Sequence, residues 1–294
     1  MKILLTGSQG QVGYELQRSL ACLGEVIATD KHNLDLSDDA AIRHFIQLYQ
    51  PGLIVNAAAY TAVDQAETEQ DLAMQINAQA PKIMAEEAKQ LGIPVIHYST
   101  DYVFNGQNTQ PWLEQDQTDP INVYGKTKLL GEQLIADTGV AYLVFRTSWV
   151  YGQRGNNFLL TMKRLATERD ELSVVDDQIG APTWCRHIAD ATAQIIAQGI
   201  ATKNLQQFIQ QHSGIYNLSG DGVTSWHGFA KAIFDELEQQ GEKVADLHAI
   251  VTSAYPTPAK RPHYSCLNNE KLESTFGITL PNWQDSLMLV MKEK

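Results

Sequence analysis

Short apolar runs alternate with longer amphipathic stretches through the first half of the chain. The runs are continuous in apolar character, as in strands that are buried on both faces of a parallel sheet. The stretches between them repeat apolar residues at helical spacing. This alternation predicts an α/β fold, a doubly wound parallel sheet of Rossmann type. The strand-like runs are Lys2–Thr6, Glu25–Asp30, Leu53–Ala59, Pro94–Asp101 and Tyr142–Arg146.

The pattern loosens after residue 150, which favours a smaller C-terminal α/β lobe. We therefore assign residues 1–150 to the Rossmann domain, with later segments returning to it, and residues 151–294 mainly to the lobe. A long helical region is expected up to Leu91. Later helices are expected at Phe158–Arg169, His187–Ala197 and Ser225–Gln240, and strands at Leu172–Val175 and Gly214–Leu218.

A glycine-rich turn follows the first strand and opens a helix. Glycines there let backbone N–H groups approach a pyrophosphate at the positive end of the helix dipole. This position, between a strand and a helix, predicts a site for a nicotinamide dinucleotide. The candidate contacts are Gly7, Gly10, Gln11, Val12 and Gly13.

Asp30 ends the second strand, close to the expected 20 residues past the glycines, where a carboxylate would bind the adenosine ribose. Lys31 and His32 follow and could accept a 2′-phosphate instead, so both NADPH and NADH stay open as cofactors. Further candidate cofactor contacts are Asp35 and Leu36, where an adenine would lie, and Ala59, Tyr60 and Thr61, at the end of a strand with small residues.

Tyr124 and Lys128 lie four residues apart in a helical stretch. This spacing sets both side chains on one face, about one turn apart. A free phenol has a pKa of about 10, and a nearby cation lowers it toward neutrality. Such a phenol can donate its proton to a carbonyl oxygen as hydride reaches the carbon. We therefore predict Tyr124 as the proton donor and Lys128 as its partner.

The strand that ends at Asp101 carries a pair of hydroxyl side chains, Ser99 and Thr100. In a parallel sheet with crossover helices, the carboxyl ends of the strands line the ligand crevice. Both hydroxyls are therefore candidates to hydrogen-bond a substrate carbonyl. The polar loop between Thr100 and Tyr124 could carry further substrate contacts.

Composition narrows the class of protein. Hydrophobic residues make up 44% and charged residues 19%, and the formal net charge is −12, which argues against a nucleic-acid partner. No apolar run approaches the roughly 20 residues that span a bilayer, and three widely spaced cysteines indicate a reduced, cytoplasmic setting. The acidic residues Asp64, Glu67, Glu69 and Asp71 are interpreted as a solvated helix start, so no metal is predicted.

The proline-rich segment Tyr255–Pro262 can form neither a regular helix nor a central strand. It is expected to run extended across a site, with Lys260 and Arg261 as cations. Because the planar guanidinium suits phosphate, we predict Arg261 as a ligand for a substrate diphosphate.

Together these motifs resemble the extended short-chain dehydrogenase/reductase superfamily. The resemblance rests on Gly7, Gly10 and Gly13, on Asp30, on the strand that ends at Asp101, and on the Tyr124/Lys128 pair. Narrower likeness to its nucleotide-sugar reductases covers nearly the whole chain. The stretches that carry it are Val55–Asp64, His97–Phe104, Asn122–Lys128, Phe145–Tyr151, Gln178–Thr183 and Pro256–Pro262.

The resemblance implies NAD(P)H-dependent reduction of the C4 keto group of dTDP-4-dehydro-β-L-rhamnose to dTDP-β-L-rhamnose, the last step of dTDP-L-rhamnose biosynthesis. It implies that Lys128 also binds the cofactor ribose, that Thr100 bonds the reacting oxygen, and that Asp101 and Trp149 contact the sugar nucleotide. Some members hold a divalent metal between subunits through an acidic residue that this chain replaces with Trp184–His187. A metal-bridged dimer is therefore not expected, although a homodimer stays open.

Two alternatives remain at this stage. One is another extended short-chain enzyme, such as a sugar-nucleotide epimerase. The other is a non-catalytic regulatory subunit of the methionine adenosyltransferase type. The presence of Tyr124, Lys128 and Thr100 favours an enzyme over the regulatory protein.

Overall fold

A six-stranded parallel sheet forms the centre of the computed structural model, which describes residues 1–292. Its strands lie in the order β10-β5-β4-β3-β1-β2. The predicted doubly wound α/β fold is confirmed, and each expected strand of the first half is present. The bounds are β1 (Lys2–Thr6), β2 (Glu25–Ala28), β3 (Leu53–Asn56), β4 (Val95–Thr100), β5 (Tyr142–Thr147) and β10 (Gly214–Asn217).

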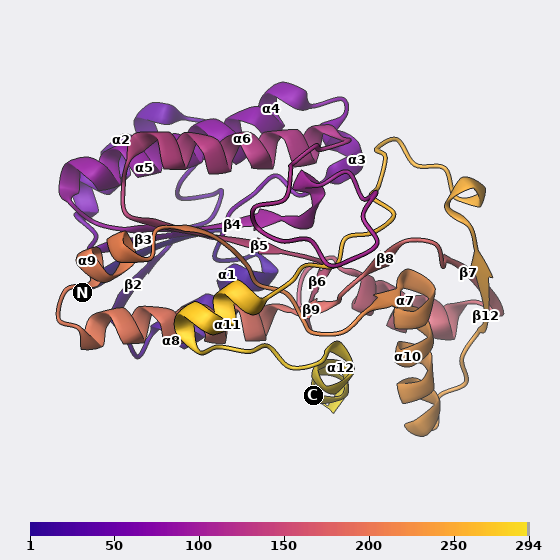
Figure 1. Cartoon of the computed structure of the whole chain (residues 1–294). Helices are drawn as coiled ribbons and strands as arrows, with labels where there is room; N and C mark the ends of the chain where they lie inside the picture. Colours follow the sequence, from indigo (N-terminus) through magenta and orange to yellow (C-terminus); the bar gives the residue numbers. More distant parts are fainter. Residues whose placement is uncertain (293–294) are drawn as a thin grey trace.

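Helices cover both faces of this sheet (Figure 1). One face carries α2 (Asp39–Tyr49), α5 (Ala80–Leu91) and α6 (Val123–Thr138). The other carries α1 (Gln11–Leu20), α8 (Cys185–Ala201), α9 (Leu205–Gln211) and α11 (Glu270–Phe276). Three of these elements, α8, α9 and α11, come from the second half of the chain and return to the sheet, as does β10. The division at residue 150 stays a prediction.

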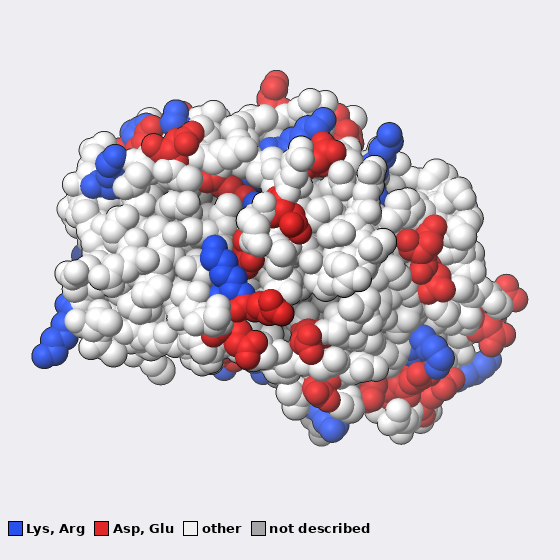
Figure 2. Space-filling view, viewed as in Figure 1, with Lys and Arg blue, Asp and Glu red and all other residues white. Residues whose placement is uncertain are grey.

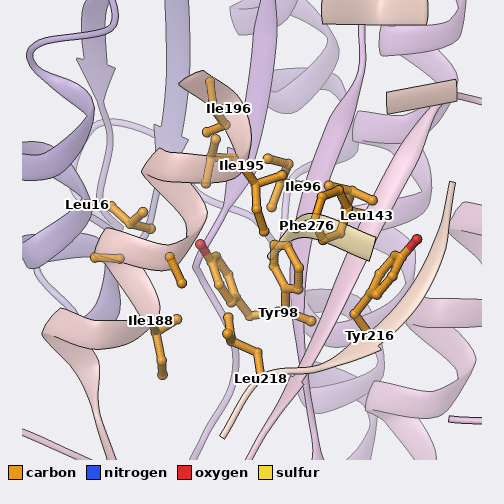
Figure 3. Packing of buried hydrophobic residues seen from close by; sticks show 14 of the residues in the cluster. Leu16, Ile96, Tyr98, Leu143, Ile188, Ile195, Ile196, Tyr216, Leu218 and Phe276 are labelled. Carbon is orange, nitrogen blue, oxygen red and sulfur yellow. The ribbon is translucent and has the colours of Figure 1, made fainter. Parts of the chain in front are cut away.

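The core on the α8 side joins residues that are far apart in sequence (Figure 3). Ile96 and Tyr98 of β4 and Leu143 of β5 pack against Ile188 and Ile195 of α8 in one buried cluster. On the opposite face a second cluster lies under α2 and α5 and includes the alternate residues of the same strands. Side chains therefore point to opposite faces in turn along each buried strand.

The predicted helical region up to Leu91 is broken into several pieces. It contains α3 (Val63–Ala66), α4 (Gln70–Met74), a π-helical turn η1 (Gln75–Gln79) and α5. In the π-helical turn, Asn77 bonds both backbone groups of Tyr60, with Tyr60 N donating at 2.8 Å and Asn77 Nδ2 donating to Tyr60 O at 3.1 Å. The local widening of the helix thus brings an amide side chain to the loop after β3.

The lobe has its own buried cluster, formed by side chains of α7 (Phe158–Glu168), α10 (Trp226–Gln239) and α12 (Trp283–Lys292). Ser225 caps α10 as predicted, with its Oγ accepting from Gly228 N at 2.9 Å. The predicted strand Leu172–Val175 is confirmed within β7 (Glu171–Val175), but its five-residue partner β12 (Asp246–Ile250) was missed, and so were the two-residue strands, which carry no readable period. The paired strands are β7 with β12, β6 (Val150–Tyr151) with β9 (Thr183–Trp184), and β8 (Ile179–Gly180) with β11 (Thr224–Ser225).

Charged side chains are dispersed over the surface. On the face that Figure 2 shows, most Lys and Arg side chains lie beside Asp or Glu, and acidic groups gather toward the lower right, over the lobe. Among the helices described within residues 1–292, none combines the length and apolar character needed to cross a membrane.

Candidate active site

Helix α6 presents Tyr124, Lys128 and Glu132 at successive four-residue intervals, so all three lie along one stripe of the helix. Asn122 starts the helix, because its Oδ1 accepts a hydrogen bond from Gly125 N at 2.8 Å. A Cβ on Gly125 would lie 2.2 Å from the backbone oxygen of Tyr102. Only glycine therefore lets this end of α6 approach the segment that follows β4.

The Tyr124 side chain is partly buried and its ring meets the Tyr102 ring edge-on, with centroids 5.7 Å apart. Desolvation by the surrounding protein raises the pKa of Tyr124 to about 12, and the interaction with the Thr100 side chain opposes that rise. From the sequence we predicted that the pKa of Tyr124 would fall, and for the protein without bound ligands that prediction is wrong. Burial destabilises the phenolate more than the neighbouring groups stabilise it. Tyr124 is therefore a fully protonated donor at neutral pH.

Lys128 is 1% exposed and directs its amine toward β4. Its Nζ donates to the backbone oxygen of Tyr98 at 2.6 Å and lies 3.2 Å from His97 Nε2. Burial lowers the pKa of Lys128 to about 8, and the carboxylate of Glu132 opposes that shift. The amine thus has specific partners on the sheet, one helical turn from Tyr124.

Thr100 and Asp101 sit where β4 ends and the short 3₁₀ turn η2 (Asp101–Val103) begins. Thr100 Oγ1 donates to Asp101 Oδ1 at 2.8 Å and accepts from Tyr102 N at 3.2 Å. Burial raises the pKa of Asp101 to about 6, against hydrogen bonds from Thr100, Ser265 and Ser148. The structure therefore brings three predicted residues, Thr100, Asp101 and Tyr124, to one strand end.

The glycine-rich turn packs directly against the loop that follows β3, the neighbouring strand of the sheet. Gly7 has φ +70°, and a Cβ there would lie 2.7 Å from Ala58 Cα. A Cβ on Gly13 would lie 2.1 Å from Gly7 O, so α1 begins tight against the turn. The turn and the loop after β3 meet between β1 and β3, where the strand order reverses, and this is where dinucleotides bind in such sheets. The cradle therefore fits a nicotinamide dinucleotide.

The remaining predicted cofactor contacts have varied surroundings. Asp30 Oδ1 accepts from His32 N at 2.8 Å, and Asp35 Oδ1 accepts from Ser37 N at 2.8 Å. Leu36 packs against the cluster under α2 and α5. Gln11 Nε2 donates to Val150 O at 3.3 Å. Val12 packs against the cluster on the α8 side of the sheet and against the cluster of the lobe. The last three predicted contacts, Ala59, Tyr60 and Thr61, follow β3.

Trp149 links the sheet to the lobe. Its ring stacks on that of Trp226, with centroids 3.5 Å apart and planes at 7°. Its backbone has φ 46°, in the left-handed region that favours glycine. The preceding residue, Ser148, donates to Asp101 Oδ2 at 3.4 Å. Trp149 therefore directly follows a residue that is hydrogen-bonded to Asp101 at the end of β4.

Arg261 forms a two-pronged ion pair with Asp64, with contacts of 3.0 and 2.7 Å. The interpretation of the acidic residues as a solvated helix start is wrong for Asp64 and for Glu67, which accepts from Val123 N at 2.9 Å, whereas Glu69 and Asp71 are exposed near the start of α4. Asn122 Nδ2 donates to Lys260 O at 2.7 Å. An ion pair thus links the segment 255–262 to α3, and a hydrogen bond links it to the start of α6.

Three buried polar residues next to the site were missed by sequence reasoning: Asn56, Asn77 and His97. Each lies inside an apolar or helical run, where a polar residue reads as a break in the pattern. The available signal was the position of Asn56 at the carboxyl end of β3. His97 lies opposite Asn56, in the middle of the neighbouring strand β4. Among the residues that the structure describes, no cluster of His, Cys, Asp or Glu could hold a metal ion.

Comparison with known proteins gives consistent matches along the whole chain. A family model described as "RmlD substrate binding domain" matches residues 1–294. The chain is 46% identical to the dTDP-4-dehydrorhamnose reductase of Escherichia coli (strain K12), over 100% of this chain and 98% of that protein. A solved dTDP-4-dehydrorhamnose reductase from Clostridium acetobutylicum is similar with a TM-score of 0.90 and 38% identity, covering 99% and 98% of the two chains. The enzyme from Bacillus anthracis, solved in complex with NADP, is similar with a TM-score of 0.88 and 34% identity, covering 100% and 99%.

Proposed function

The chain belongs to the RmlD substrate binding domain family, and from that membership we propose that it reduces the C4 keto group of dTDP-4-dehydro-β-L-rhamnose with NADPH, giving dTDP-β-L-rhamnose. Relatives that bear the name of this reductase match the chain from end to end. The observation that carries the proposal is the meeting of the Tyr124 phenol, the Thr100 hydroxyl and the glycine-rich cradle at one edge of the sheet. A phenol in that position serves a carbonyl reduction.

The cofactor supplies a hydride to C4 when it is bound. The side chains of this protein handle the proton and the orientation of the sugar. Tyr124 holds its proton throughout the neutral range and donates it to the C4 oxygen. Thr100 lies beside the phenol and orients that oxygen, and we assign sugar contacts to Asp101 and Trp149. The buried amine of Lys128 is positioned by β4 and is the group we assign to the cofactor ribose.

An assay with the pure protein, NADPH and the keto sugar tests the function. Oxidation of NADPH at 340 nm, with dTDP-β-L-rhamnose as the product, is the expected result. Turnover of the sugar nucleotide without net oxidation would indicate an epimerase, and binding without turnover would indicate a regulatory protein. Either of these outcomes would overturn the proposal. We also propose a cytoplasmic location and a homodimer, which light scattering of the pure protein would test.

Asp30→Ala is expected to weaken NADH binding by about 10-fold or more, the scale of one hydrogen bond to a charged group. NADPH binding should fall less, because the carboxylate accepts from a free 2′-hydroxyl but repels a 2′-phosphate. The dissociation constants are measured by fluorescence titration. The matched variant Lys31→Ala should weaken NADPH more than NADH. Equal losses for both cofactors in Asp30→Ala would show that this carboxylate does not read the ribose.

Arg261→Ala is expected to raise KM for the sugar nucleotide by about 10- to 150-fold, equivalent to roughly 1.5–3 kcal/mol for a hydrogen bond to a charged group. The proposal is that Arg261 binds the diphosphate. Its charge acts on Tyr102, whose ring contacts that of Tyr124, so Arg261 lies near the proposed active site. Because its pairing with Asp64 competes with phosphate, Asp64→Asn should hold KM steady or lower it.

Lys260→Ala serves as the matched control for Arg261→Ala, since that side chain is exposed in the same segment. It should leave KM for the sugar nucleotide within about twofold, which is under 0.5 kcal/mol. If a folded Arg261→Ala protein behaves the same way, the Asp64–Arg261 pair only fastens the segment and the diphosphate is held elsewhere.

A further inference from the structure

An aromatic stack joins the end of β5 to the lobe. Trp149, which follows β5, stacks on Trp226, the first residue of α10, with ring centroids 3.5 Å apart and planes at 7°. The Trp226 ring also meets the ring of Phe158 on α7, with centroids 4.6 Å apart. Both Phe158 and Trp226 pack against the buried cluster of the lobe. The Trp149 ring is therefore supported by side chains that continue into the core of the lobe.

Gly180 of β8 covers the second face of the Trp149 ring. A Cβ on Gly180 would lie 2.4, 2.6 and 2.8 Å from Trp149 Cε2, Cζ2 and Nε1. An atom beside this edge would be closer to Cζ2 and Nε1 than to Cε2, which lies between them, so the point is over the ring face. Two rings with centroids 3.5 Å apart leave no room between them. Gly180 and Trp226 therefore lie on opposite faces of the indole.

The two elements that cover the Trp149 ring are themselves joined. Gly180 pairs with Thr224 in the β8–β11 ladder, and Trp226 follows two positions after Thr224. The backbone of Trp149 is also held, because its carbonyl accepts from Thr183 N at 3.2 Å. Its φ of 46° is one that a non-glycine residue keeps only where the surroundings fix it, and such residues cluster at ligand sites.

With both faces covered, the edge of the Trp149 indole is the part of the ring that a ligand can reach. The ring is half-buried, and its Nε1–H has no hydrogen-bond partner among residues 1–292. This N–H is not enclosed by the protein. The preceding residue, Ser148, is hydrogen-bonded to Asp101 at the end of β4. The stack thus fixes a ring beside the proposed sugar site and leaves its edge with a free donor.

We propose that Trp226 is a positioning residue for the sugar nucleotide and acts through Trp149. It covers the face that Gly180 leaves open and so holds the indole edge in the orientation that the ligand meets. Without this cover the ring would turn about its side-chain bonds and present that edge for only part of the time. The dissociation constant rises in inverse proportion to that fraction. The proposal rests on the proposed contact between Trp149 and the sugar nucleotide.

Nuclear magnetic resonance tests the stack and its edge without enzymatic activity. Each of the five tryptophans contributes one indole N–H signal, and Trp149→Phe identifies that of Trp149. Nuclear Overhauser effects should connect the rings of Trp149 and Trp226, both in the free protein and with bound dTDP-β-L-rhamnose. The ligand should move the Trp149 N–H signal. A stack that opens when the ligand binds, or a signal that the ligand leaves in place, would overturn the proposal.

Trp226→Leu is expected to raise the dissociation constant for dTDP-β-L-rhamnose by about 3- to 10-fold, as for a ring that keeps its bound orientation for about 10–30% of the time. Leucine keeps an apolar contact with the lobe cluster but offers the indole no flat surface. Trp226→Phe restores a flat ring and should stay within about twofold of wild type. The dissociation constant for NADPH should not change in either variant. Calorimetry measures both constants.

A double variant separates a role through Trp149 from a general effect on the lobe. In a Trp149→Ala background, Trp226→Leu should change the dissociation constant by less than about twofold, because the ring that it supports is gone. Trp283→Phe is the matched control, since Trp283 packs in the same lobe cluster, edge-on to Phe229. It should leave sugar-nucleotide binding unchanged. An undiminished loss in the Trp149→Ala background, or an equal loss in Trp283→Phe, would show that Trp226 does not act through Trp149.

If Trp226→Leu fails to fold, the wild-type spectra and the Trp226→Phe variant still decide the question. Normal oxidation of NADPH, with sugar-nucleotide binding that Trp226→Leu leaves unaffected, would overturn the role of Trp226 alone. A protein that shows the expected binding but does not oxidise NADPH with the keto sugar would overturn the proposed function and leave the role of Trp226 standing.

Discussion

Tyr124→Phe is expected to lower kcat by about 10²–10⁴-fold, the usual contribution of a positioned general acid. The phenyl ring keeps the edge contact with Tyr102 and removes only the hydroxyl. The dissociation constant for NADPH should therefore hardly change. Steady-state kinetics with the keto sugar, together with fluorescence titration of NADPH, measure the two quantities separately.

Tyr102→Phe is the matched control, since it removes a hydroxyl from the neighbouring ring. It should keep kcat within about threefold of wild type, a change of less than 1 kcal/mol in the barrier. Should Tyr124→Phe retain more than about a third of wild-type kcat, Tyr124 is not the acid. A similar loss in both variants would indicate a general effect on the packing of the two rings.

Arg146→Met is expected to lower the free energy of unfolding by about 3–5 kcal/mol, because it leaves a buried carboxylate without its partner. Arg146 and Glu132 are 2% and 1% exposed, and the guanidinium reaches both carboxylate oxygens, at 3.0 and 2.7 Å. Arg146 also donates to the backbone oxygen of Glu114 at 3.2 Å. Urea unfolding followed by circular dichroism measures the loss.

The double variant Arg146→Met with Glu132→Leu should recover most of that stability, since both charges are then gone. The exposed pair Arg164–Glu168, with side chains 58% and 52% exposed, provides a second comparison. Arg164→Met should change the free energy of unfolding by less than about 1 kcal/mol. If Arg146→Met is as mild as Arg164→Met, the buried pair contributes little to stability.

The sheet was predictable because each strand of the first half is a continuous apolar run between turn residues. Longer elements of the lobe, such as α10 with its Ser225 cap, were also predictable. The short lobe strands were not, since pairs such as β8 with β11 are formed by two residues each. The break of the helix before α5 was missed because the π-helical turn depends on a tertiary contact of Asn77 with Tyr60.

Within the site, spacing was enough to place Tyr124 and Lys128 on one helix face and Thr100 at the end of a neighbouring strand. Spacing says nothing about burial, which sets the direction of the Tyr124 pKa. Partners from distant parts of the chain were equally out of reach. Asp64 and Arg261 are 197 positions apart, and His97 and Lys128 meet only through the packing of α6 on β4.

The late return of α8 to the sheet has a consequence for synthesis on the ribosome. When β5 has emerged, five strands of the sheet exist, but the face formed by Ile96, Tyr98 and Leu143 lacks the cover of α8 until that helix is complete at Ala201. At 5–20 residues per second, the intervening stretch takes on the order of 3–11 s. During that interval the nascent chain exposes an apolar surface of the kind that chaperones bind. The order of the elements along the chain therefore sets how long the nascent protein is prone to aggregation.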